Sequence, residues 1–290
     1  MSVQIARLPD GRRLHLNHGP IDLIVEAFGA PDEIGAAYRQ AVAGFSDVLP
    51  TLVRELKVLR AALQDACPRV TGPVARRMVR ACWPYRDSFI TPMAAVAGSV
   101  ADHMLQLMLA GRTLDRAYVN DGGDIAFHVA PGHKLTCGLV ADLAAPAVDG
   151  TLALTADMPV RGLATSGRAT KGSGGRSFSF GIADTVTVLA ADGATADAAA
   201  TVIANAVDLP GHVAVVRGPA SEIDPDSDLG ARPVTLEVGE LSDRDVDIAL
   251  AAGVARAETL GRAGLIHGAV LVLRQRFATV GTALPRLAAA

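Results

Sequence analysis

The sequence has few aromatic residues and almost no excess of charge of either sign. Aromatic residues make up 4% of the 290 residues, and the formal net charge is −3. A protein that binds nucleic acid needs a basic face to neutralise phosphates, and proteins that bind single strands stack the bases on aromatic rings. The composition therefore argues against a nucleic-acid partner.

Long apolar runs are also missing, although half of the residues are hydrophobic and the mean hydropathy is positive. The longest runs, such as Pro92–Ala101 and Ala269–Leu273, fall well short of the roughly 20 residues that cross a bilayer. The N-terminal segment soon meets Asp10 and Arg12 and lacks the apolar stretch of a signal peptide. We therefore expect a cytoplasmic protein with no membrane partner.

Cysteine is scarce, and its pattern excludes two kinds of site. The three cysteines are Cys67, Cys82 and Cys137, and no two of them form a C-x-x-C pair. Structural zinc sites and thioredoxin-like motifs use closely spaced cysteines. We expect reduced thiols with a structural role.

Strands and helices are mixed along the chain without strict alternation. Alternating hydrophobicity around the turn at Asn17–Pro20 predicts a β-hairpin over residues 12–28. The further helices that we expect are Pro31–Leu63 with a break near Pro50, Val74–Trp83, Pro92–Ala110, Asp192–Val207 and Asp243–Gly261. The further strands that we expect are Arg116–Asn120, Ile125–Val129, Thr136–Ala141, Leu152–Ala156, Leu163–Thr165, Thr185–Leu189, Val213–Val216, Val234–Val238 and Leu265–Leu273. Long helices set apart from runs of strands predict an α+β fold.

A hydroxyl-rich stretch is the first candidate for chemistry. Thr165, Ser166, Gly167 and Arg168 precede a Gly/Ser loop at Lys171–Gly175. Hydroxyls, flexible backbone N–H groups and nearby basic side chains suit a phosphate or a carboxylate. The stretch does not match the P-loop pattern. A solvated loop between strands explains the same residues equally well.

Asp197 and Thr201 are the second candidate. They stand four residues apart on an expected helix and therefore share one face. A carboxylate and a hydroxyl on one face can give two oxygen ligands to a hard cation such as Mg²⁺. The alternative is that Asp197 only favours the dipole at the start of the helix.

Two further segments place small residues beside acidic ones. Gly122 and Gly123 lie between two expected strands, where they permit close backbone approach but are also typical of a tight hairpin turn. The segment Ala97–His103 places Asp102 and backbone carbonyls near a helix start, where they could meet a ligand. Close helix packing is the other interpretation of that segment.

Taken in order, these segments resemble the ApbE family of flavin transferases. That family carries G-K-G-x-A-x-D, then V-N-x-G-G-[ND]-I, then T-S-G, and then V-T-V with A-D-x-x-x-T. The matching residues are Ala97–Asp102, Val119–Ile125, Thr165–Gly167, Val186–Val188 and Ala196–Thr201. The resemblance covers about residues 90–210, and the order of the motifs is more specific than any one of them.

A branch of uncharacterised ApbE-like proteins is still more similar. Its pattern G-R-S-F-S-x-G-I-A-D-x-V-T-V-L-A resembles Gly175–Ala190. This resemblance implies an α+β architecture of the tunnelling-fold (T-fold-like) kind, with a mainly antiparallel sheet and packed helices. It implies one domain over residues 1–290, or two related halves at about 1–150 and 151–290, and by analogy a homodimer.

The family resemblance also implies a function and a site. ApbE transferases move FMN from FAD to a protein threonine with Mg²⁺. By this resemblance Asp197 and Thr201 are metal ligands, helped by a backbone carbonyl from Gly98–Asp102. The residues that would border the flavin nucleotide are Gly122, Gly123, Thr165, Ser166, Gly167 and Arg168.

The chain departs from the transferases in two places. The stretch H-x-I-D-P-x-T-G is replaced by Phe178–Thr185, and the lysine of G-K-G is absent at Gly98-Ser99. Three hypotheses therefore stay open. The protein is a Mg²⁺-dependent enzyme acting on FAD, FMN or a related nucleotide, a non-catalytic binder of a flavin or another small anionic ligand, or a different enzyme on the same scaffold. In the last case Asp184 or Asp102 would serve as general acid or base.

Overall fold

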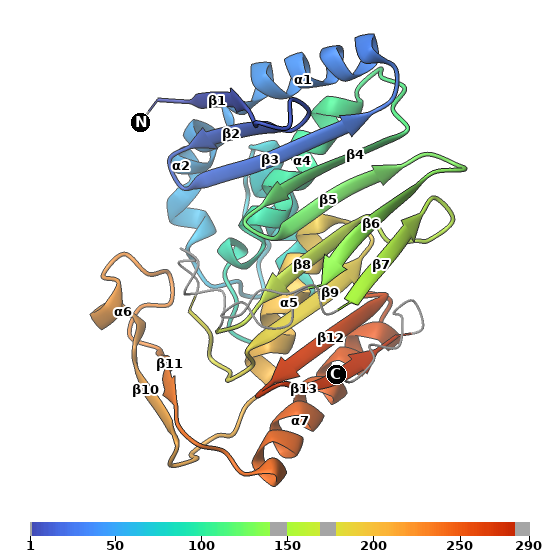
Figure 1. Cartoon of the computed structure of the whole chain (residues 1–290). Coiled ribbons are helices and arrows are strands. Elements are labelled where there is room, and N and C mark those ends of the chain that lie inside the picture. The colour runs from blue at the N-terminus through green and yellow to red at the C-terminus, as the bar shows by residue number, and fades with distance from the viewer. Residues whose placement is uncertain (1, 140–149, 169–177, 282–290) are drawn as a thin grey trace. The chain divides into compact units, whose positions relative to one another are not determined.

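A computed structural model describes residues 2–139, 150–168 and 178–281 (Figure 1). The loop expected at Lys171–Gly175 and the end of the strand expected at Thr136–Ala141 lie outside these ranges. The chain divides into two compact units that interleave along the sequence. The first unit is Met1–Thr136, Ala153–Ala164 and Ala190–Ala198, and the second is Cys137–Leu152, Thr165–Leu189 and Ala199–Ala290.

The strands of the first unit form an antiparallel series. β1 (Gln4–Arg7), β2 (Leu14–His18), β3 (Ile21–Phe28), β4 (Arg116–Asp121) and β5 (Asp124–Val129) pair in chain order, and β5 then pairs with the start of β8 (Gly162–Ser166). Alternate residues are buried along β2 and in the first half of β3, as the hydrophobic alternation predicts. The β-hairpin expected over residues 12–28 is confirmed.

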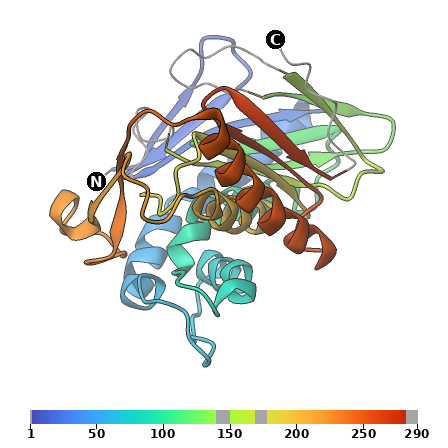
Figure 2. The same cartoon turned by 90° about the horizontal axis from the view of Figure 1, so that it is seen from below.

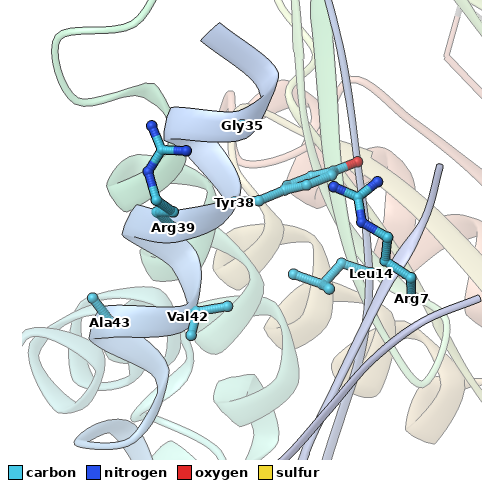
Figure 3. A pocket seen from close by; sticks show the side chains of 7 residues that line it. All are labelled: Arg7, Leu14, Gly35, Tyr38, Arg39, Val42 and Ala43. Atoms are coloured by element: carbon cyan, nitrogen blue, oxygen red, sulfur yellow. The ribbon is translucent and has the colours of Figure 1, made fainter. Parts of the chain in front are cut away.

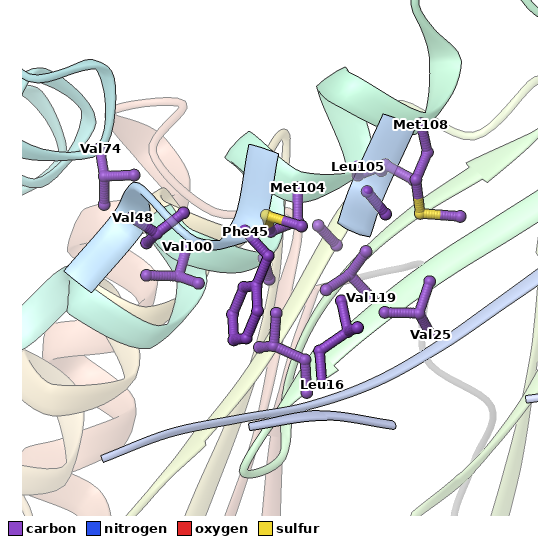
Figure 4. Close-up of a cluster of buried hydrophobic side chains, with 14 of the residues drawn as sticks. Leu16, Val25, Phe45, Val48, Val74, Val100, Met104, Leu105, Met108 and Val119 are labelled. Atoms are coloured by element: carbon purple, nitrogen blue, oxygen red, sulfur yellow. The ribbon is translucent and has the colours of Figure 1, made fainter. Parts of the chain in front are cut away.

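Helices cover one face of these strands (Figures 1 and 2). They are α1 (Pro31–Phe45), α2 (Val48–Leu59), α3 (Pro73–Cys82) and α4 (Val96–Leu109), with short 3₁₀ turns η1 (Trp83–Tyr85) and η2 (Pro92–Ala95). Their apolar side chains meet those of β2 to β4 in one core, where Leu16, Phe45, Met104 and Val119 are all fully buried (Figure 4). This core fixes α4, which carries part of the candidate site.

The second unit contains a fully buried strand pair beside an edge strand. β12 (Gly268–Leu273) runs antiparallel to both β9 (Thr185–Ala190) and β13 (Arg276–Val280). Every residue of β9 and β12 is buried. α7 (Asp243–Arg262) packs on β12 and β13 and begins with a capping box between Ser242 and Asp245.

The remaining elements are short, except for one helix. β10 (Val215–Pro219) and β11 (Pro233–Val238) form a two-stranded ribbon next to the one-turn helix α6 (Ala220–Ile223). β6 (Lys134–Leu139) pairs with β7 (Gly150–Thr155). α5 (Gly193–Ala206) begins in the first unit and ends in the second. The mixed helices and antiparallel strands confirm the α+β class.

Several expected boundaries were wrong. The first helix breaks at Ser46–Asp47 rather than near Pro50, because Pro50 sits in the first turn of α2, where no N–H is needed. α2 ends at Leu59 and not at Leu63. The helix expected from Pro92 starts as a 3₁₀ turn and becomes α-helical at Val96.

Two expected strands also begin later than predicted. The strand expected at Val213–Val216 begins at Val215, and the strand expected at Leu265–Leu273 begins at Gly268. The residues before β12 instead complete the turn after α7, where Leu265 donates its N–H to the carbonyl of Leu260. Among the residues that the structure describes, no helix combines the length and apolarity that a membrane span requires.

Candidate functional site

The starts of α4 and α5 hold each other through two aspartates of the first unit. Both carboxylate oxygens of Asp102, on α4, accept hydrogen bonds from the backbone N–H groups of Gly193 and Ala194, each at 2.9 Å. In return, Asp197 on α5 accepts a hydrogen bond from the N–H of Gly98 at 3.0 Å. Each helix therefore supplies an acceptor for N–H groups that its neighbour cannot pair internally.

Glycines let the two helix starts come this close. A Cβ on Gly98 would overlap the carbonyl of Gly193, and a Cβ on Gly193 would lie 3.0 Å from the carbonyl oxygen of Gly98. Gly162 on β8 is equally restricted, because its Cβ would overlap the backbone of Asp192. The close packing that Ala97–His103 suggested is therefore present, and it positions the helix that carries Asp197.

Asp197 lies in a group of acidic side chains. Burial raises its pKa well above the ordinary value, and the charges of Asp124 and Asp121 raise it further. Asp121 is 8% exposed, and burial together with Asp124 raises its pKa as well. Within the described ranges, no basic side chain forms an ion pair with Asp121 or Asp197. The group therefore favours a proton or a cation.

Gly122 and Gly123 bring Asp121 and Asp124 together. They form the two-residue turn between β4 and β5, with φ angles of 63° and 111°. The side-chain oxygen of Asn120 accepts a hydrogen bond from the N–H of Gly123 at 2.8 Å. A Cβ at either glycine would meet nothing within 4 Å, so the turn conformation alone accounts for them.

The oxygen donors around Asp197 fit a hard cation. Asp197 is half-buried. Thr201 stands one helical turn further along α5. In the part of the chain that the structure describes, no three side chains of His, Cys, Asp or Glu group to hold a metal ion. A cation would thus depend on one carboxylate with hydroxyl, carbonyl and water oxygens, which is the ligand chemistry of Mg²⁺.

The pH dependence of stability tests the position of Asp102. Burial outweighs the two N–H bonds and raises its pKa from 3.8 to about 6. Between about pH 4 and 6 the folded protein therefore holds a proton that the unfolded chain has released, so raising the pH through this window lowers stability. Urea denaturation should show this fall in the native protein relative to Asp102→Asn, with no further difference above about pH 6 to 7. A difference between the two proteins that is independent of pH would contradict the assignment.

A second group of predicted residues meets in the second unit. The hydroxyl of Thr165 lies 2.9 Å from that of Thr187 on β9, and the N–H of Arg168 donates to the carbonyl of Ala183 at 2.9 Å. Gly167 has φ 142°, and its Cβ would overlap the carbonyl of Asp184. The T-S-G stretch therefore runs directly beside the segment that leads into β9. Ser166, at the end of β8, is half-buried.

Asp184 has a partner that the sequence did not reveal. Its own N–H donates to the carbonyl of Val272, and its Oδ2 accepts the N–H of Arg274 at 2.6 Å. Burial lowers the pKa of the half-buried Arg168, Arg274 lowers it further, and Asp184 opposes both. Arg168 and Asp184, both predicted as site residues, thus interact electrostatically with Arg274. In the sequence, Arg274 carries no motif and simply follows the strand expected to end at Leu273.

A separate hollow of about 350 Å³ lies in the first unit beside α1 (Figure 3). Arg7, Leu14, Tyr38, Arg39 and Val42 are among the residues that line it. None of the predicted site residues does so. The hollow is therefore not the candidate site.

Comparison with known proteins decides the family. A sequence model of the family described as "AbpE bacteria" matches residues 5–280. The chain belongs to that family. The resemblance inferred from the order of the motifs is confirmed.

Two curated relatives are similar in sequence to this member of the AbpE bacteria family. A UPF0280 protein of Methanothermobacter thermautotrophicus is 38% identical over 172 residues, which are 58% of this chain and 62% of the relative. A UPF0280 protein of Methanothrix thermoacetophila is 36% identical over 135 residues, which are 47% of this chain and 52% of the relative. The match thus spans between half and two thirds of the length of these relatives.

The similarity in three dimensions covers the whole chain. The apo flavinyl transferase ApbE of Pseudomonas stutzeri superposes with a TM-score of 0.50, covering 100% of this chain and 98% of that one. The sequence identity is 12%, so this likeness shows the fold. The ApbE-like architecture that the motifs implied is confirmed.

Proposed function

We propose that the protein is an ApbE-like enzyme that acts on FAD, FMN or a related nucleotide with Mg²⁺, by FMN transfer or FAD hydrolysis. The observation that carries the proposal is the placement of Asp197. It is fixed by the N–H of Gly98, and burial together with the charges of Asp124 and Asp121 raises its pKa. A cation at this point would relieve the repulsion between the carboxylates. The flavinyl transferase of similar fold supports a flavin as the ligand.

The predicted residues then divide into separate roles. Asp197 and Thr201 would hold Mg²⁺, which when bound offsets charge on the phosphates of a nucleotide. Asp102 uses both oxygens to hold the start of α5, so we assign it to positioning Asp197. In the second unit, Thr165–Arg168 would border the nucleotide, and Asp184 is the remaining candidate for proton transfer.

One observation favours a non-catalytic binder as the second candidate. The segment that replaces H-x-I-D-P-x-T-G is packed inside the second unit. Ile182 and Ala183 are fully buried, and the N–H of Phe180 donates to the side chain of Asn205 at 2.9 Å. This segment serves packing, and it lacks the histidine and the proline of the transferase stretch. The homodimer, the T-fold relation and the cytoplasmic location also remain proposals.

A product assay separates the two candidates. Purified protein is incubated with FAD and Mg²⁺, and the flavins and the protein are separated by chromatography. The enzyme hypothesis predicts released FMN or covalently flavinylated protein, with neither formed by Asp197→Asn. Asp32→Asn, a change at an exposed position of α1, is the matched control and should keep full activity. Intact FAD that remains bound would instead favour the non-catalytic binder.

A further inference from the structure

The turn between β12 and β13 has an unusual backbone. Leu273 pairs with Arg276, so Arg274 and Gln275 form a two-residue hairpin turn. Their φ angles are 51° and 62°, which is the left-handed region. Such turns favour asparagine and glycine, because other side chains crowd the backbone there. Strain of this kind persists where the surroundings hold it, and it gathers at ligand-binding sites.

Arg274 is held in place by its backbone and by one end of its side chain. Its N–H donates to Oδ2 of Asp184 at 2.6 Å, and its Nη2 donates to the carbonyls of Val238 and Gly239, both at 2.7 Å. Across the described residues, the Nε and Nη1 atoms of Arg274 have no hydrogen-bond partner. The guanidinium is therefore fixed but keeps donors to offer.

The backbone around Arg168 runs beside Asp184, the residue that accepts the N–H of Arg274. The backbone of Arg168 is held by the carbonyl of Ala183, and the Arg168 side chain is half-buried. Burial lowers the pKa of its guanidinium and the charge of Arg274 lowers it further, while the charges of Asp184 and the exposed Glu237 oppose this effect. No described residue forms a hydrogen bond or ion pair with the guanidinium of Arg168. Arg168 and Arg274 thus both keep unused guanidinium donors, and their backbones lie on either side of Asp184.

We propose that Arg168 and Arg274 form an anion subsite in the second unit that binds a phosphate group of the ligand. Guanidiniums bind phosphate oxygens through paired, charge-assisted hydrogen bonds. The strained turn keeps Arg274 in position before the ligand arrives, so little side-chain freedom is lost on binding. The assignment of this phosphate to a flavin nucleotide rests on the proposed function, whereas the anion subsite itself does not.

The test compares three probes in calorimetric titrations: inorganic pyrophosphate, FMN, and riboflavin, which has no phosphate. Arg274→Asn removes the guanidinium while asparagine tolerates the left-handed backbone. We expect pyrophosphate and FMN to bind this variant about tenfold or more weakly, because charge-assisted hydrogen bonds are lost. Riboflavin should bind it as it binds the native protein. Arg168→Gln should show the same pattern.

Gln275→Gly is the matched control in the same turn. It relieves strain without touching a guanidinium, so the melting temperature should rise by a few degrees while anion affinity stays the same. A merely structural role for Arg274 predicts instead that Arg274→Asn lowers the melting temperature and leaves pyrophosphate affinity unchanged. That result would overturn the subsite.

The remaining outcomes separate the subsite from the proposed function. Arg274-dependent binding of pyrophosphate without binding of either flavin would support the subsite and reject the flavin ligand. Equal affinity for FMN and riboflavin without pyrophosphate binding would reject the subsite and keep the flavin ligand. A native protein that binds none of the three probes would overturn both.

Discussion

Gly98→Ala is expected to destabilise the protein by at least about 3 kcal/mol. The new Cβ would overlap the carbonyl carbon and oxygen of Gly193, which belong to backbone and cannot rotate away. Relief of the overlap requires α4 and α5 to separate, and that movement weakens the hydrogen bonds of Asp102 and Asp197 as well. Urea denaturation followed by circular dichroism measures the loss.

Gly35→Ala is the matched control, since Gly35 is also helical and also belongs to the first unit. Its Cβ would meet only Nη1 of Arg39 at 3.4 Å, the mobile end of an exposed side chain. Alanine favours a helix by up to about 1 kcal/mol over glycine, so this variant should be as stable as the native protein or more so. Equal stabilities of the two variants would contradict the close contact between α4 and α5.

Gly167→Ala is expected to have the second large effect, a loss of about 3 kcal/mol or more. Two causes add at this position: a φ of 142°, which side chains rarely adopt, and a Cβ that would overlap the carbonyl of Asp184. The same displacement would move Arg168 away from Asp184. Thermal and urea denaturation measure the loss, and the pyrophosphate titration should show weaker binding.

Gly264→Ala separates the two causes. Gly264 also has a positive φ, 71°, but a Cβ there would meet nothing within 4 Å. The Gly264→Ala substitution should therefore lower the free energy of unfolding only by the cost of a left-handed backbone, about 1–2 kcal/mol. If Gly167→Ala proves no more costly than Gly264→Ala, the T-S-G glycine is not required by contact with the segment before β9.

The parts of the fold that could be predicted are those with a periodic buried face. The hairpin of β2 and β3 and the helix α5 follow from such patterns, whereas the fully buried strand β9 follows from its short run of β-branched and apolar residues. β1 and β13 were missed because they are edge strands: all four residues of β1 are exposed, so it has no buried alternation to detect. The break at Ser46–Asp47 was misplaced because proline ends a helix interior but suits a first turn.

The candidate site could be predicted only in pieces. Sequence order and family resemblance pointed to Asp197, Thr201 and Asp102. They could not show that Asp102 accepts N–H groups 91 and 92 residues away, because such contacts depend on the packing of α4 against α5. Arg274 carries no local motif and was missed for the same reason. The roles of all these residues in catalysis stay predictions.

The most direct test of the account is calorimetric titration of FAD and FMN, with and without Mg²⁺, into the native protein and Asp197→Asn. Asparagine is close in shape to aspartate and carries no charge, and burial raises the pKa of Asp197 towards the uncharged form. The variant should therefore fold, and its melting temperature checks this. We expect flavin binding that Mg²⁺ strengthens in the native protein and no such strengthening in Asp197→Asn. Flavin binding with the same Mg²⁺ dependence in both proteins, or no flavin binding by the native protein, would contradict it.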